Sequence, residues 1–101
     1  MRRAARVDET QAAIVDALRK AGAYVWIIGL PVDLCVGVAG KTVLVECKSL
    51  QGKKKPRAKA YTSLQRDFMR DWLGGPVATL TDVPGAIALV NMLKGLPAAP
   101  P

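Results

Sequence analysis

The chain has 101 residues, half of them hydrophobic, and its 15 Lys and Arg against 8 Asp and Glu give a formal net charge of +7. This length allows one domain, and the apolar content excludes a chain that is disordered throughout. The basic excess favours a polyanionic partner such as nucleic acid. No apolar run approaches the ~18 residues of a membrane span, and residues 1–11 lack the apolar core of a signal peptide. We therefore expect no membrane association and a cytoplasmic location.

The first predicted helix spans residues 8–21, after a basic arm at residues 1–7. Asp8 fits the N-cap position, and Gln11 completes a capping-box spacing with it. Helical periodicity places Asp8 at the edge of the inward face and Glu9 on the opposite side. An apolar stripe follows at helical spacing, formed by Ile14, Val15 and Leu18.

Residues 23–28 are β-branched and aromatic, which predicts a strand. The alternation of side chains along a strand puts Tyr24 and Trp26 on one face. We expect the two rings to pack in the core or in a dimer interface rather than to stack on bases.

Residues 31–48 are predicted to form a β-hairpin with apolar residues in both arms. The chain must reverse at Ala39 and Gly40, and glycine accepts the positive φ that tight hairpin turns need. A turn centred between them pairs residues whose numbers sum to 79. In this register Cys35 and Cys47, the only cysteines, point to opposite faces of the sheet, so we expect no disulfide between them.

The same register places Asp33 opposite Glu46, with Lys48 on the same face as Glu46. Two facing carboxylates repel and destabilise a sheet, and a divalent cation would remove that repulsion. Oxygen ligands suit Mg²⁺ or Mn²⁺, and a neighbouring ammonium suits a substrate with phosphate oxygens. The chain has no histidine for acid–base catalysis. The set therefore predicts metal-assisted hydrolysis of a phosphodiester.

Residues 49–61 are predicted to form a flexible basic loop. Five basic side chains gather in it around a proline: Lys53, Lys54, Lys55, Arg57 and Lys59. Because the loop leaves directly from Lys48, we expect it to lie beside the metal site and bind DNA phosphates. Each phosphate contact would steepen the salt dependence of binding by about 0.9 log units per log salt.

Residues 62–73 are predicted to form a second helix, in which Thr62 and Gln65 have capping-box spacing. Residues 76–80 then form a short strand beside the hairpin. The last helix, capped by Asp82 or by the threonine before it, ends near Leu93. Its inward side is expected to hold Ala86, Leu89, Val90 and Leu93.

A single domain over residues 8–94 and a disordered tail at residues 95–101 complete the expected organisation.

Three blocks of the chain, in order, resemble the virus-type replication-repair nuclease (VRR-NUC) family, whose stand-alone members occur in phages and prophages. The blocks are VDETQAAIVDALRKAGA, PVDLCVGVAGKTVLVECK and YTSLQRDFMRDWLGGPVATLTDVPGAIAL. Asp, a hairpin and Glu-x-Lys form the pattern of the PD-(D/E)XK nucleases. In that pattern Pro directly precedes the Asp, whereas here Val32 intervenes.

The resemblance implies an α/β fold with a restriction-endonuclease-like core, a mixed sheet flanked by helices in the order α-β-β-β-α-β-α. It implies that Asp33, Glu46 and the backbone carbonyl of Cys47 bind Mg²⁺ or Mn²⁺. Lys48 would then position the attacking water or offset charge on the phosphate.

Further site residues follow from the same resemblance. Gln65 matches a glutamine that reaches toward the active site in the family, so it is either a catalytic residue or a helix cap. Asp8, or less well Glu9, could add an acidic side chain near the metal.

The implied function is that of a metal-dependent, structure-specific DNA endonuclease, a homodimer that resolves four-way (Holliday) junctions. The same residues would serve a nickase, a flap nuclease or a restriction-like nuclease. If both acids are only salt-bridged to Lys48 and the loop, the chain is a DNA-binding module without catalysis.

Overall fold

The computed structural model describes residues 9–49 and 63–96. In chain order, the elements are α1 (Glu9–Lys20), β1 (Tyr24–Ile27), β2 (Leu34–Val38), β3 (Lys41–Cys47), α2 (Ser63–Asp71), β4 (Val77–Leu80) and α3 (Val83–Gly95). This is the predicted order α-β-β-β-α-β-α, and the fold is α/β. The basic arm, Asp8, the basic loop after Ser49 and the last five residues of the tail lie outside the described residues.

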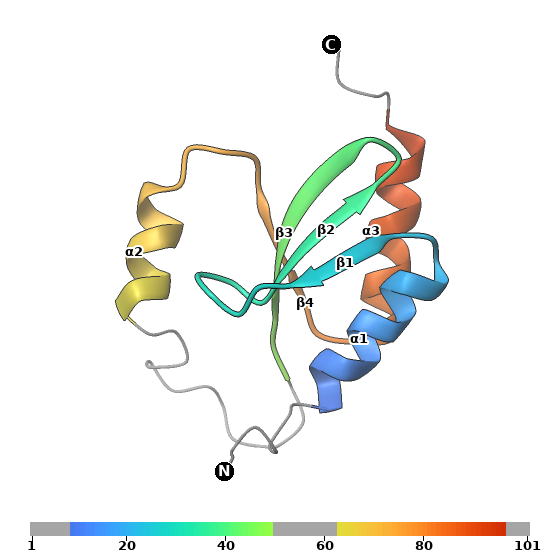
Figure 1. Ribbon diagram of the computed structural model, residues 1–101, viewed down its shortest axis with the longest axis horizontal. Coiled ribbons are helices and arrows are strands. Elements are labelled where there is room, and N and C mark those ends of the chain that lie inside the picture. Colours follow the sequence, from blue (N-terminus) through green and yellow to red (C-terminus); the bar gives the residue numbers. More distant parts are fainter. Residues whose placement is uncertain (1–8, 50–62, 97–101) are drawn as a thin grey trace.

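The four strands form one mixed sheet in the order β1-β2-β3-β4. β1, β2 and β3 pair antiparallel, and β4 pairs parallel to β3 after the connection through α2. α1 and α3 lie side by side on one side of the sheet, and α2 lies on the other (Figure 1). The loop between β1 and β2 projects toward α2 in the same view.

The hairpin of β2 and β3 has the register that the turn residues predict. Ala39 and Gly40 form the turn with φ values of 55° and 79°, the combination that a type I′ turn requires at both central positions. Leu34 therefore pairs with Val45, and all the other partners also have numbers summing to 79. As expected, both cysteines are free.

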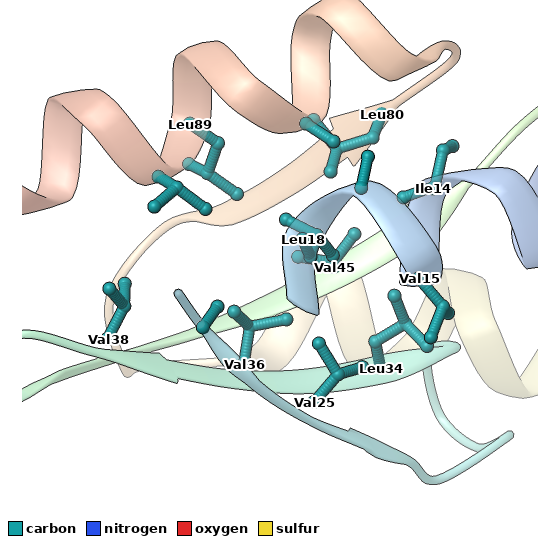
Figure 2. Close-up of a cluster of buried hydrophobic side chains, with 14 of the residues drawn as sticks. Ile14, Val15, Leu18, Val25, Leu34, Val36, Val38, Val45, Leu80 and Leu89 are labelled. Carbon is teal, nitrogen blue, oxygen red and sulfur yellow. The ribbon is translucent and has the colours of Figure 1, made fainter. Parts of the chain in front are cut away.

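One face of the sheet carries the hydrophobic core, against α1 and α3 (Figure 2). The predicted stripe of α1 is buried, and the last helix buries all four residues expected on its inward side. The strands contribute β-branched and aliphatic side chains to the same core: Val25, Leu34, Val36, Val38, Val45 and Leu80. α2 is different, because the one residue it buries is the polar Gln65.

Three side-chain hydrogen bonds support the edge of the sheet and the ends of the helices. β1 is an edge strand, and Arg19 Nη2 of α1 donates to the carbonyl of Val25 at 3.1 Å. Lys94 Nζ of α3 donates to the carbonyl of Ala21 at 2.8 Å and so ties the two helices together. Asp82 caps α3 by accepting from the backbone nitrogen of Gly85 at 2.8 Å.

No helix in the described part of the chain has the length and apolar character needed to cross a bilayer.

Candidate functional site

Asp33 lies at the entry to β2, where backbone hydrogen bonds hold it in place. Its carbonyl accepts from the backbone nitrogens of Ile28 and Gly29 at 2.9 and 3.1 Å, which extends the pairing of β1 with β2. Its side-chain Oδ2 accepts from the backbone nitrogen of Cys47 at 2.8 Å. Val32, the departure from the family pattern, is buried at 1% exposure and leaves Asp33 beside β3.

Glu46 is a buried carboxylate near the end of β3, with 5% of its surface exposed. The amide Nε2 of Gln65 lies 3.3 and 3.4 Å from its two oxygens. Lys48 Nζ lies 3.9 Å from Glu46 Oε2. The structure thus brings together Asp33, Glu46, Lys48 and Gln65, all four residues predicted to be catalytic.

Burial raises the pKa of Glu46 above its ordinary value of 4.5, and the negative charge of Asp33 adds to the rise. The positive charge of Lys48, the Gln65 amide and a hydrogen bond from the Asp33 backbone act in the opposite direction without cancelling it. When all three charged groups are ionised, two carboxylates face one ammonium. Among the described residues, negative charge therefore exceeds positive charge here, and a divalent cation would offset the excess.

The donor set fits a hard divalent cation. Asp33 and Glu46 supply carboxylate oxygens, and Mg²⁺ typically uses only one or two carboxylates and keeps several waters. The N–H and C=O of a strand residue point to the same side. Since the Cys47 N–H points to Asp33, its carbonyl faces that side too. Within the described residues no group of three or more His, Cys, Asp or Glu side chains gathers.

Gln65 reaches the site from α2, on the side of the sheet away from the core (Figure 1). Its amide donates to a carboxylate of β3, so the interpretation as a site residue agrees with its position. The capping partner Thr62 and the acidic candidate Asp8 lie outside the described residues. Glu9 is described and exposed at the start of α1.

The five basic residues predicted to bind DNA also lie outside the described residues: Lys53, Lys54, Lys55, Arg57 and Lys59. An open groove of about 690 Å³ is present between the β1–β2 loop and α2, and it is lined mainly by apolar side chains. None of the four predicted catalytic residues lines it. Its two carboxylates, Asp67 and Asp71, are each paired with Arg70.

Thr79 is a neighbour of the site that sequence reasoning missed. It pairs with Glu46 across β3 and β4, and its exposed hydroxyl belongs to the same face of the sheet. The sequence carries no signal for this neighbour, because a parallel pair joined through a helix has no tight turn to set its register.

Comparisons with protein-family models, with curated proteins and with solved structures find no match to this chain. The resemblance to VRR-NUC nucleases therefore depends on the sequence blocks and stays a prediction.

Proposed function

We propose that this protein is a metal-dependent DNA endonuclease of the VRR-NUC type. The observation that supports it best is the buried carboxylate of Glu46, whose pKa is raised by burial and by Asp33. Burying a charge beside a like charge destabilises a fold. A cation bound between the two carboxylates would turn this unfavourable pair into a binding site.

In this proposal Asp33, Glu46 and the Cys47 carbonyl hold Mg²⁺ or Mn²⁺. Such an ion supplies a water nucleophile at neutral pH and offsets charge on the phosphate. Lys48, half-buried beside Glu46, orients the attacking water or neutralises a non-bridging phosphate oxygen. Gln65 fixes the orientation of the Glu46 carboxylate through its amide.

The substrate we propose is branched DNA, with the four-way junction as first choice and a homodimer as the working form. The net charge of +7 supports a nucleic-acid partner. The choice of junction and the dimer follow from the family resemblance. A nickase, a flap nuclease and a restriction-like nuclease use the same residues, so they remain alternatives that substrate choice separates.

A second candidate is a DNA-binding module in which the acids form only structural ion pairs. Two observations favour it: Lys48 Nζ lies 3.9 Å from Glu46 Oε2, and Asp33 Oδ2 accepts from the Cys47 backbone nitrogen at 2.8 Å. The rise in the pKa of Glu46 means that its contact with Lys48 leaves the charge of the buried carboxylate unfavourable. We therefore prefer the metal-dependent enzyme.

The test uses labelled four-way junction, flap, nicked and plain duplex DNA, each with Mg²⁺ and with chelator. We expect Mg²⁺-dependent cutting of a branched substrate. Lys48→Ala should abolish cutting and leave binding nearly intact, whereas Lys20→Ala, on the exposed surface of α1, should cut normally. Normal cutting by Lys48→Ala, or binding of DNA without cleavage of any substrate, would contradict the assignment.

A further inference from the structure

Two aromatic side chains of β1 project into solvent. Tyr24 is 70% exposed and Trp26 is 65% exposed, the highest values for aromatic residues in the described part of the chain. Of the two environments expected for them, the core is therefore wrong, and a dimer interface stays a prediction. Val25, between them, is buried, so the strand presents both rings on the face away from the core.

This aromatic face is continuous with the carboxylate site. Trp26 pairs with Cys35, which pairs with Leu44, two residues before Glu46 on the same face of β3. Two strand spacings and a two-residue rise place the Cα atoms of Trp26 and Glu46 about 12 Å apart. Consecutive nucleotides of a stacked strand are ~3.4 Å apart. The distance from the carboxylates to the rings therefore corresponds to a few nucleotides along a strand whose phosphate is held at the carboxylates.

The surroundings of the rings suit a nucleic-acid strand. The cross-strand neighbours of Tyr24 and Trp26 are small or uncharged, namely Gly37, Thr42, Cys35 and Leu44. No acidic residue is paired with either ring, in a chain of net charge +7. Asp33, two residues before Cys35 at the entry to β2, is a diagonal neighbour of Trp26 on this face and belongs to the carboxylate site. The other neighbours carry no charge and do not obstruct a base that lies flat on an aromatic ring.

A second copy of the chain suits this surface less well. A protein seated on Trp26 would stand about 12 Å from Glu46, where DNA must approach the carboxylates. Exposed apolar side chains also occur on α3, at Val83, Ile87 and Met92. α3 lies on the opposite side of the sheet (Figure 1), so a dimer formed there would leave the carboxylates accessible.

We propose that Trp26 and Tyr24 form a stacking platform for unpaired bases next to the phosphodiester that the site cuts. The inference rests on the proposed function for its choice of DNA as ligand. Stacking on an aromatic side chain tolerates any base, because every base has a π-face. A platform of this kind favours DNA with unpaired nucleotides near the cutting position over perfectly paired duplex.

Tryptophan fluorescence tests the platform without any need for cleavage. The chain contains two tryptophans, Trp26 and Trp72, so Trp72→Phe leaves the platform indole as the only one. We expect an oligothymidylate, added with chelator present, to quench the fluorescence of Trp26 in the Trp72→Phe protein strongly. Trp26→Phe, which retains only Trp72, should show little change. An oligonucleotide of equal length with abasic positions should quench neither protein.

Binding measurements supply the second readout. Trp26→Ala should weaken binding to a junction with unpaired nucleotides by about 5- to 150-fold, the range for one lost stacking contact. Its binding to nicked, fully paired duplex should stay unchanged, and Trp26→Phe should retain most of the affinity for the junction. Trp72→Phe is the matched control and should bind both substrates normally.

The outcomes separate this inference from the proposed activity. If DNA quenches the fluorescence of Trp26 but the protein cuts no DNA, the platform is supported and the proposed endonuclease activity is wrong. If the protein cuts DNA but DNA does not quench the fluorescence of Trp26, the platform is wrong and the proposed endonuclease activity stands. If Trp26→Ala instead converts a dimer to a monomer in sedimentation and DNA does not quench Trp26, the face belongs to a second copy and the platform is wrong.

Discussion

Replacing Glu46 by glutamine should stabilise the metal-free protein at neutral pH. The substitution keeps the shape of the side chain and an oxygen that accepts from Gln65, but it removes a charge from a residue that is 5% exposed. The size of the effect depends on three opposing contributions.

The attraction between Lys48 Nζ and Glu46 Oε2 at 3.9 Å is about 4 kcal/mol at an effective dielectric constant of ~20. Facing strand residues have Cβ atoms roughly 5 Å apart, and charges at that separation repel by about 3 kcal/mol at the same dielectric, which we take for Asp33. These two nearly cancel. The remaining contribution is the lost hydration of Glu46, about 1–3 kcal/mol for a buried polar group. Set against the remaining attraction of about 1 kcal/mol, this loss leaves Glu46→Gln more stable by up to about 2 kcal/mol, or up to roughly 15 °C in Tm.

The sign of the pH dependence follows from the raised pKa of Glu46. The folded state then holds the proton more tightly than the unfolded state. The carboxyl of Glu46 therefore favours folding most at pH below its ordinary pKa of 4.5. That contribution to the free energy of unfolding is lost as pH rises through the pKa of the folded state. The two proteins should therefore be about equally stable near pH 4. The advantage of Glu46→Gln should grow with pH and level off above the folded pKa.

Urea denaturation with chelator at several pH values measures this difference. Asp16→Asn, which alters an exposed carboxylate paired with Lys20, is the matched control and should show no growing advantage. Added Mg²⁺ should stabilise the wild type and leave Glu46→Gln unchanged. A Glu46→Gln protein that is less stable than the wild type at neutral pH, or an advantage independent of pH, would refute this description of the site.

Three further substitutions test the fold that positions the site. Asp82→Ala should lose the hydrogen bond to Gly85 and cost about 1 kcal/mol in chemical denaturation; an unchanged midpoint would mean that the cap contributes nothing. Arg19→Ala should free the Val25 carbonyl at the sheet edge and promote self-association that rises with protein concentration in light scattering; scattering equal to that of the wild type would contradict a protective role. Ala39→Asn should stabilise the hairpin by roughly 0.5–1 kcal/mol, because asparagine tolerates a φ of 55° better than alanine; a lower Tm would contradict this.

The hairpin shows how far the sequence could locate the site. Ala39 and Gly40 determine the turn, the turn determines the register, and the register brings Asp33 to Glu46. Each step is local, so the pairing followed from turn chemistry and side-chain alternation alone. The predicted positions of Asp33, Glu46 and Lys48 were correct for this reason.

Residues that depend on tertiary packing were harder to predict. The spacing of Gln65 allowed two roles, a helix cap or a residue of the site. The contact with Glu46 favours the site residue. This contact was hard to predict because it depends on where α2 lies against the sheet. Thr79 was missed, since the parallel register of β4 has no local determinant. The exposure of Trp26 contradicted core packing, one of the two environments expected, because α1 and α3 pack on the other face of the sheet and α2 leaves Trp26 uncovered.

The central claim is that Asp33 and Glu46 together hold a divalent cation, and titration with Mn²⁺ tests it most directly. Electron paramagnetic resonance measures the free ion at neutral pH for the wild type, Asp33→Asn, Glu46→Gln and the control Asp16→Asn. We expect saturable binding by the wild type and the control, and binding more than about tenfold weaker in the other two. Equal Mn²⁺ affinity in all four proteins would contradict the claim.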